Sequence, residues 1–324
     1  MLLGFDIGGT KCAVILGKES SHDIAIIDKR VLPTDKPVYE MIELLFKTAE
    51  ALLKRKNITV DEISSIGISC GGPLSSERGM ILSPPNLPGW INIPIVELCT
   101  KRFGKTTVLQ NDANACAVAE WKFGAGRGYD NVIFLTFGTG MGAGLVLNGK
   151  LYSGKTDLAG EVGHIRLAEM GPVGFGKAGS FEGFCSGGGI AQIGQIKARE
   201  KLQLGETVTF CKSLEDISGI TAKSIAEAAY AGDETAKEVY KICGYYLGRA
   251  LSLFIDILNP DIIILGSIYG RARDLIDPSM LEVINKEAIP DSAKHCKITP
   301  AGLQESIGDY AALSLAMLAT ENQK

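Results

Sequence analysis

The chain has 324 residues, of which 46% are hydrophobic, so it is long enough to form a large core and two domains. Its 33 basic and 37 acidic residues leave a net charge of -4, which excludes a general attraction to nucleic acid. The eight cysteines are too few for a disulfide framework, and no apolar run approaches the ~20 residues of a membrane span. An acidic residue at position 6 comes too early for a signal peptide. We therefore expect a cytoplasmic protein with reduced thiols that binds neither membrane nor nucleic acid.

The first predicted element is a β-hairpin over residues 2–16, with its tip at Asp6-Ile7-Gly8-Gly9-Thr10-Lys11. The paired glycines permit a tight turn, and the tip combines a carboxylate, a hydroxyl and an ammonium group. Backbone N–H groups and Thr10 can donate to phosphate oxygens, while Asp6 can hold a magnesium ion or its waters. An ordinary glycine hairpin with solvated charges is the alternative, and the tip alone does not decide between the two.

Residues 39–54 carry apolar side chains at helical spacing and end in a basic cluster, which predicts a helix. A buried strand is expected over 63–70, followed by a turn at Gly71-Gly72-Pro73. The next loop, 83–90, places Asn86 beside a tryptophan in a backbone that prolines restrict. Such a loop either covers a small polar ligand or is only a connector.

An apolar run ends at Gln110-Asn111-Asp112, and a helix is predicted from about 113 to 123. An Asp or Asn at such a junction is most often an N-cap, whose side chain accepts a backbone N–H. Asp112 is also the candidate catalytic base of the chain. Its position alone favours the cap, so the choice depends on the surrounding motifs.

Two segments look like nucleotide-binding motifs without matching them. Residues 99–106 end like a P-loop, but Cys99 replaces the first glycine and a strand is expected to follow. The run Gly138-Thr139-Gly140-Met141-Gly142 leads from a strand at 132–137 into a hairpin whose turn is Asn148-Gly149, whereas a dinucleotide fingerprint must open a helix. This second tip repeats the plan of the first about 130 residues later, which indicates an internal duplication. Two such tips can hold one polyphosphate from both sides.

The glycine-rich region 157–189 carries Glu161, His164 and Glu182. The spacing of Glu161 and His164 suits either a metal site or a wall of groups that bind hydroxyls, although a histidine among glycines is more often structural. Helices are expected over 221–231 and 233–258, and Asn259-Pro260-Asp261 ends the second. A buried strand then leads to Gly266, at the usual place for a ligand in an α/β sheet, and the last helix is expected over 308–320.

Taken together, these motifs resemble the sugar kinases of the ROK family (repressors, open reading frames and kinases), within the actin-like ATPase superfamily. The resemblance covers residues 4–316 and implies an α/β protein with a duplicated actin-like ATPase (ribonuclease H-like) fold. It implies a small N-terminal domain over 1–111 and a larger domain over 112–307, with a cleft between them. A C-terminal helix at about 308–324 is expected to pack back on the small domain. A homodimer is also implied.

The resemblance also gives each motif a role. The ATP contacts it implies are Asp6, Gly8, Gly9, Thr10, Lys11, Gly138, Thr139, Gly140, Gly142 and Gly266, with magnesium held by Asp6 directly or through water. The sugar contacts it implies are Gly71, Asn86, Asn111, Glu161, His164 and Glu182, with Asp112 as general base. The expected activity is ATP-dependent phosphorylation of a hexose hydroxyl, of glucokinase type. Fructose, mannose, allose, N-acetylmannosamine or a β-glucoside are alternative substrates. A non-catalytic sugar sensor and an actin-type structural ATPase are alternatives of other classes.

Three departures from the family pattern have consequences. The family often has a structural zinc bound by one histidine and three cysteines, but the cysteine positions here hold Val173, Phe175 and Ser180, so no zinc is predicted. Ser267 follows Gly266 where the family has a second glycine, which affects the adenine pocket. The repressors of the family carry a DNA-binding segment before the first hairpin, and Asp6 lies too near the start of this sequence for one, so a kinase is expected.

Overall fold

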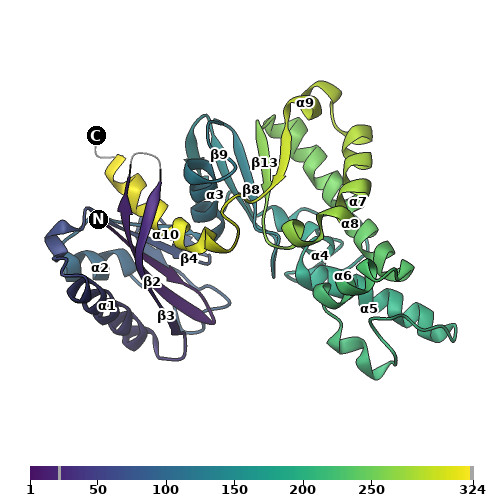
Figure 1. The fold of residues 1–324 in the computed structure, drawn as a ribbon, viewed down its shortest axis with the longest axis horizontal. Helices are drawn as coiled ribbons and strands as arrows, with labels where there is room; N and C mark the ends of the chain where they lie inside the picture. Colours follow the sequence, from purple (N-terminus) through teal and green to yellow (C-terminus); the bar gives the residue numbers. More distant parts are fainter. Residues whose placement is uncertain (21–22, 322–324) are drawn as a thin grey trace. The chain divides into compact units, whose positions relative to one another are not determined.

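The computed structural model describes residues 1–20 and 23–321. Its framework consists of two five-stranded sheets, with strand orders β3-β2-β1-β4-β7 and β10-β9-β8-β13-β14 (Figure 1). In each sheet, three consecutive strands occupy one side and two later strands the other, so the second sheet repeats the topology of the first. This repetition confirms the predicted duplicated α/β fold.

The first sheet contains β1 (Leu2–Ile7), β2 (Lys11–Glu19), β3 (Ile24–Pro33), β4 (Ser65–Cys70) and β7 (Thr107–Asn111). Strand β1 pairs antiparallel with β2 and parallel with β4, and β4 pairs parallel with β7. All six residues of β4 are buried, as expected for a central parallel strand. The core on one side of this sheet includes the rings of Phe5, Phe46 and Phe103, whose centroids lie 5.3–6.3 Å apart. Helices α1 (Val38–Arg55) and α2 (Ile95–Phe103) supply Phe46 and Phe103.

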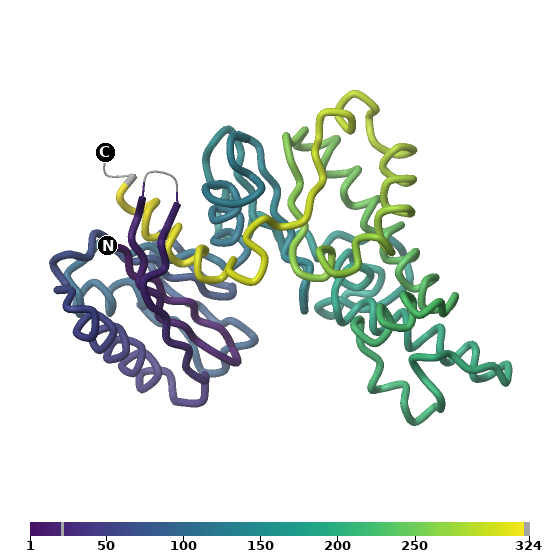
Figure 2. The backbone as a smooth tube through the Cα atoms, viewed as in Figure 1, coloured from purple at the N-terminus to yellow at the C-terminus, as the bar shows by residue number. Residues whose placement is uncertain are grey.

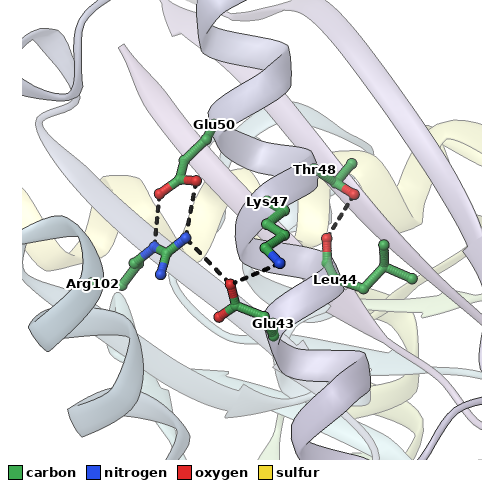
Figure 3. Close-up of polar contacts among 6 residues, drawn as sticks. All are labelled: Glu43, Leu44, Lys47, Thr48, Glu50 and Arg102. Atoms are coloured by element: carbon green, nitrogen blue, oxygen red, sulfur yellow. Dashed lines mark hydrogen bonds and ion pairs between the residues drawn. The ribbon is translucent and has the colours of Figure 1, made fainter.

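Ion pairs join the outer surfaces of α1 and α2 (Figure 3). Arg102 donates from Nε to Glu50 Oε1 at 2.7 Å and from Nη2 to Glu50 Oε2 at 3.0 Å. Glu43 Oε1 lies 3.5 Å from the Arg102 guanidinium and 3.6 Å from Lys47 Nζ. Because these groups are exposed, the pairs orient the two helices and contribute little to stability.

Helix α10 (Ile307–Glu321) lies beside the strands of the first sheet, although it comes last in the described chain (Figure 2). Gly67 in β4 makes this close packing possible, since a Cβ there would lie 2.0 Å from the carbonyl oxygen of Ala312. The buried Ser65 hydroxyl donates to the carbonyl of Ala316. Helix α3 (Asp112–Phe123) packs on α10 through small side chains, with Ala115 against Ala311.

The second sheet contains β8 (Val132–Leu135), β9 (Ala143–Leu147), β10 (Lys150–Tyr152), β13 (Ile262–Leu265) and β14 (Lys297–Pro300). Strands β8, β13 and β14 run parallel. Between β9 and β10, at the predicted hairpin turn, Asn148 and Gly149 have φ values of 51° and 69°, and positive φ at both central residues is what a type I′ turn requires.

Helices follow in the order α4 (Phe181–Phe184), α5 (Gly187–Gln203), α6 (Ala222–Tyr230), α7 (Glu234–Leu258), α8 (Ile268–Glu287) and α9 (Pro290–His295). The long helix α7 packs closely on α8, because a Cβ at Gly248 would lie 2.6 Å from the carbonyl oxygen of Met280. Thr221 and Asp233 cap α6 and α7, and Asn259 ends α7 in the left-handed conformation, so the predicted helix boundaries are confirmed.

The remaining elements are short. They are β5 (Leu74–Ser75), β6 (Met80–Ile81), β11 (Val173–Gly174), β12 (Lys177–Ala178), and the 3-10 helices η1 (Val60–Glu62), η2 (Val162–His164), η3 (Glu215–Gly219) and η4 (Gln304–Ser306). Strands β5 and β6 form one two-stranded hairpin, and β11 and β12 form another.

By contacts, the chain forms two compact units. Unit 1 comprises Met1–Gly128, Gly144–Ala159 and Gly302–Lys324, and unit 2 comprises Tyr129–Ala143 and Gly160–Ala301. The predicted domain division after residue 111 stays a prediction. Within residues 1–20 and 23–321, no helix has both the length and the apolar character needed to cross a bilayer.

Candidate active site

The first glycine tip, Asp6–Lys11, joins β1 to β2 in unit 1. The Gly8 N–H donates to the carbonyl of Lys11 at 3.1 Å and closes the tip. Thr34, directly after β3, stabilises the tip, since its Oγ1 donates to the Gly8 carbonyl at 2.7 Å. Thr10 and Lys11 are exposed, so both side chains are accessible to a ligand.

Asp6 lies half-buried near the end of β1, among other carboxylates of unit 1. Its pKa is raised to about 6, first because burial removes water from the carboxylate and then because Asp112 and Asp309 repel its negative charge. Lys29 and Lys11 oppose the shift. Lys29 forms an ion pair with Asp309, at the start of α10. Acidic and basic groups near the first tip thus act together on one half-buried aspartate.

At the junction of β7 and α3, the N-cap is Asn111 and not Asp112. Asn111 Oδ1 accepts from the N–H groups of Ala113 at 2.8 Å and Asn114 at 3.2 Å. Asp112 is the first residue of the helix, and its Oδ1 accepts from the next N–H, that of Ala113, at 2.8 Å. The N-cap role considered for Asp112 therefore belongs to its neighbour Asn111.

The Asp112 side chain is exposed to solvent, but the surrounding protein atoms reduce its hydration. This desolvation raises the pKa of its carboxyl group, while the hydrogen bond from Ala113 acts in the opposite direction. An accessible carboxylate with a raised pKa is a better proton acceptor than an ordinary surface aspartate.

Unit 1 brings the Asn86 loop against the first tip. A Cβ at Gly9 would lie 2.2 Å from the carbonyl oxygen of Asn86, so only glycine fits there. A Cβ at Gly71 would lie 3.5 Å from both terminal atoms of the Asn86 amide. The Asn86 amide is itself exposed. Gly9, Gly71 and Asn86, predicted from separate motifs, thus lie next to one another.

The second glycine tip, Gly138–Gly142, follows β8 in unit 2 and is held by backbone groups. The Gly138 N–H donates to the Gly140 carbonyl at 3.0 Å, and the Gly138 carbonyl accepts from the Gly187 N–H at 2.8 Å, at the start of α5. Thr136 closes the base of the tip, because its Oγ1 accepts from the Gly142 N–H at 3.0 Å. The side chain of Thr139 is exposed.

Glu182 in α4 contacts this tip directly. Its Oε2 accepts from the Met141 N–H at 3.0 Å. Gly163, between Glu161 and His164, packs against both Met141 and Glu182. A Cβ at Gly163 would lie 2.3 Å from the Met141 carbonyl oxygen and 3.2 Å from Glu182 Cβ. The structure therefore places the Glu161–His164 segment, Glu182 and the second tip in one packed cluster within unit 2.

Gly266 follows β13 beside the base of the second tip. A Cβ there would lie 2.7 Å from the carbonyl oxygen of Thr136. Ser267 adopts φ 37° and ψ -97°, a conformation that favours glycine, and its Oγ lies 3.8 Å from where a Cβ of Gly138 would be. The serine thus keeps a glycine-like backbone next to the tip.

The zinc that the family pattern implies does not fit the residues present. Val173 and Phe175 are 47% and 70% exposed apolar side chains, and the Phe175 ring lies edge-on against the His164 ring at 5.0 Å. Ser180 is fully buried and caps α4 by accepting from the Gly183 N–H at 3.1 Å. Within the part of the chain that the structure describes, no three His, Cys, Asp or Glu side chains are grouped to hold a metal ion. A zinc site of this kind needs four N or S ligands.

Two functional candidates were not foreseen from sequence. Asp309 lies in an alanine-rich helix whose pattern predicts only packing, and nothing in its spacing connects it with Asp6. Glu120 lies in α3 and is fully buried, although glutamate side chains in helices usually face water. Buried or clustered carboxylates of this kind depend on tertiary contacts, which single-sequence patterns do not contain.

Comparison with known proteins identifies the family. The sequence profile of the ROK family matches residues 2–319. A glucokinase of Thermotoga maritima is 30% identical over 315 residues, which are 97% of this chain and 96% of that protein. The structure of a ROK family glucokinase from Streptomyces griseus in complex with glucose and AMPPNP has a TM-score of 0.73 at 27% identity, covering 98% of this chain and 99% of that chain. The DNA-binding transcriptional repressor Mlc of Escherichia coli is 26% identical, over 86% of this chain and 65% of that protein.

The fold and the two glycine tips thus define an α/β protein of the sugar-kinase and repressor type. The chain belongs to the ROK family.

Proposed function

We propose that this protein transfers the γ-phosphoryl group of ATP to a hydroxyl group of a hexose. The observation that carries the proposal is the state of Asp112: the carboxylate is accessible, has a raised pKa and leaves the capping role to Asn111. The similarity to glucokinases supports the same activity, with glucose as the first substrate to test.

In the proposed reaction, the Asp112 carboxylate accepts the proton of the attacking sugar hydroxyl. The sugar oxygen then forms a bond to the γ-phosphorus, and the bond from that phosphorus to the bridging oxygen breaks with release of ADP. Because the Ala113 N–H occupies Oδ1, we assign Oδ2 as the oxygen that receives the proton. The proton later leaves to solvent.

The two glycine tips are proposed to bind the phosphates through backbone N–H groups, with Thr10 and Lys11 adding donors from the first tip. Asp6 would hold magnesium, directly or through water, and the ion would neutralise charge on the phosphates. The residues present fit this role, because magnesium bound together with phosphates requires only one or two protein carboxylates, and the charges of Asp112 and Asp309 act on Asp6. Gly266 would border the adenosine.

The sugar is proposed to contact Gly71, Asn86, Asn111, Glu161, His164 and Glu182. Glu182 also accepts from Met141 in the second tip, so it would connect the bound sugar with the phosphate-binding segment. Fructose, mannose, allose, N-acetylmannosamine and β-glucosides stay alternative substrates, and the homodimer stays a prediction from the family resemblance.

The direct test is a coupled assay of ADP formation with magnesium ATP and this panel of sugars. Turnover of at least one hexose, with product phosphorylated at a single hydroxyl, is expected. Sugar binding without turnover would instead support the sensor function. Sugar-dependent binding to DNA would support the function of the repressor relatives.

The same assay with Asp112→Asn tests the mechanism. The variant should bind sugar and nucleotide but lose about 10²–10⁴ in kcat, the range typical of a general base. Asp130→Asn, at an exposed aspartate before β8, is the control and should keep full activity. Full activity of Asp112→Asn would refute the assignment.

A further inference from the structure

The chain passes between the two compact units at four places: 128/129, 143/144, 159/160 and 301/302. Three of these crossings adjoin segments of unit 1 that contact helix α3. Gly124–Ala125 lies shortly before the first crossing, Gly144 directly after the second and Gly302–Leu303 directly after the fourth. Helix α3 is thus the element of unit 1 on which the crossing segments are gathered.

Glu120, near the end of α3, holds two of these segments. Its Oε2 accepts from the N–H groups of Ala125 at 2.8 Å and Gly302 at 3.0 Å, and its Oε1 accepts from Leu303 at 2.8 Å. The side chain is completely buried. A buried carboxylate is costly unless it is well hydrogen-bonded, and bonds from N–H groups to an ionised acceptor are stronger than neutral ones. Glu120 therefore fixes the two segments firmly to one helix.

Glycines allow the close approach. A Cβ at Gly124 would lie 2.1 Å from Glu120 Oε2, and one at Gly302 would lie 2.8 Å from the Ala125 nitrogen and 3.4 Å from the same Oε2. The two segments thus meet over the carboxylate with no room for a side chain.

The remaining segment, which begins at Gly144 after the second crossing, packs nearer the N-terminal end of α3. A Cβ at Gly144 would lie 2.4 Å from the carbonyl oxygen of Ala113 and 2.5 Å from Ala117 Cβ. Asp112, the proposed base, is the first residue of this helix. Eight residues separate it from Glu120, which corresponds to about 12 Å along a rigid helix.

We propose that Glu120 is a positioning residue for phosphoryl transfer, an inference that rests on the proposed function. It anchors two crossing segments to the helix that carries Asp112, so that this helix stays fixed where the crossing segments act as hinges and Asp112 stays aligned with the sugar hydroxyl. Hinges are formed by a few residues at the ends of elements, and their substitution often changes kcat and KM together. A small misalignment of reacting groups is sufficient for a large loss of rate.

The first test compares Glu120→Gln with Asp233→Asn. Asp233 is a matched control, because its carboxylate also accepts from backbone N–H groups, those of Thr209 at 2.8 Å and Ala236 at 3.0 Å, far from any crossing in sequence. Hydrogen exchange should become at least about tenfold faster at Ala125, Gly302 and Leu303 in Glu120→Gln, as expected when a charged acceptor is lost. In the same variant kcat should fall about 10- to 100-fold. Asp233→Asn should lower thermal stability and leave kcat unchanged.

A second pair of variants keeps the inference testable if Glu120→Gln does not fold. Gly302→Ala leaves the carboxylate in place and separates the segments, whereas Gly219→Ala meets nothing within 4 Å and is its control. Gly302→Ala should reduce kcat, and Gly219→Ala should not. Faster exchange at the crossing segments with unchanged kcat and KM would overturn the inference. Failure of the proposed function is distinct, since the unmodified protein would then turn over no sugar at all.

Discussion

The two glycine tips occupy equivalent places in a duplicated fold, yet they are stabilised and charged in different ways. Asp6 in the first tip corresponds to Thr136 in the second, 130 residues later, and Gly8 corresponds to Gly138. The first tip is surrounded by ionisable groups, with Asp112, Asp309 and lysines acting on Asp6. The second tip has the Thr136 hydroxyl at its base, and its Met141 N–H donates to the carboxylate of Glu182. The two tips thus share a glycine-rich turn after a buried strand, while the ionisable groups that act on a half-buried aspartate lie around the first tip.

The largest expected difference between the tips concerns Asp6 and Thr136. Asp6→Asn should reduce kcat on the order of 10²–10³-fold, because the variant would lose the carboxylate proposed to hold the magnesium ion that neutralises charge on the phosphates. Thr136→Val should cost less than tenfold in kcat and about 1 kcal/mol in stability, since it removes the hydrogen bonds of the Thr136 hydroxyl with the Gly142 N–H at 3.0 Å and the Gly142 carbonyl at 3.4 Å. Steady-state kinetics over a range of magnesium concentrations gives both values. Equal losses in the two variants would mean that the tips contribute in the same way.

The two equivalent glycines should differ in stability. A Cβ at Gly8 would lie 2.8 Å from the Lys11 carbonyl oxygen, whereas the nearest group to a Cβ at Gly138 is Ser267 Oγ at 3.8 Å. Gly8→Ala should therefore reduce the free energy of unfolding by about 1–3 kcal/mol, and Gly138→Ala should change it by less than about 0.5 kcal/mol. Urea denaturation followed by circular dichroism measures both. A destabilised Gly138→Ala protein would contradict the difference in packing.

How far these distinctions could be predicted from sequence depends on the kind of contact. The hairpins, β4, α1 and α7 were predicted because their apolar patterns and end signals are local. Helix α5 was not predicted, because it begins with three glycines, which favour a loop. The structure requires glycine at one of them, since a Cβ at Gly189 would lie 2.0 Å from the Gly183 carbonyl oxygen. Strand β3 was also missed, as its exposed residues show no clear alternation.

For the candidate site, motifs identified both tips and Asp112, and much of that came from the family resemblance. The exchange of roles between Asn111 and Asp112 could not be predicted, because either side chain can cap a helix and only the backbone geometry decides. The proximity of Asp309 to Asp6 and the burial of Glu120 likewise follow from packing between distant segments.

The charge around the first tip makes a further prediction about pH. The pKa of Asp6 is about 6 in the folded protein, above its ordinary value of 3.8, so the folded state binds the proton more tightly than the unfolded state. Asp6 therefore destabilises the protein above pH 6, and this cost disappears as the pH falls from 6 towards 4. Asp6→Asn should be more stable than the unmodified protein by about 1–2 kcal/mol at pH 7.5, with the difference shrinking towards pH 4. Urea denaturation at several pH values checks the sign.

With Asp6 as the proposed magnesium ligand, activity should show the opposite dependence on pH, since that binding requires the ionised carboxylate. The rate should fall as the pH drops through about 6.

For stability, a difference between Asp6→Asn and the unmodified protein that grows towards acid pH would contradict the raised pKa of Asp6.

The smallest expected effect lies beside the second tip, at Ser267. Its φ of 37° and ψ of -97° are unfavourable for a residue with a side chain, and this strain is on the order of 1–3 kcal/mol. Ser267→Gly removes the strain but increases the flexibility of the unfolded chain, which offsets about 0.5–1 kcal/mol. A net stabilisation of about 1 kcal/mol is expected, whereas Ser267→Ala should give none because it keeps a Cβ. Asn259→Gly is the control, since Asn259 has the ordinary left-handed values of 44° and 57° that asparagine tolerates. If Ser267→Gly stabilises the protein no more than Asn259→Gly does, the conformation at Ser267 carries no strain. Serine would then fit the backbone beside the second tip as well as glycine.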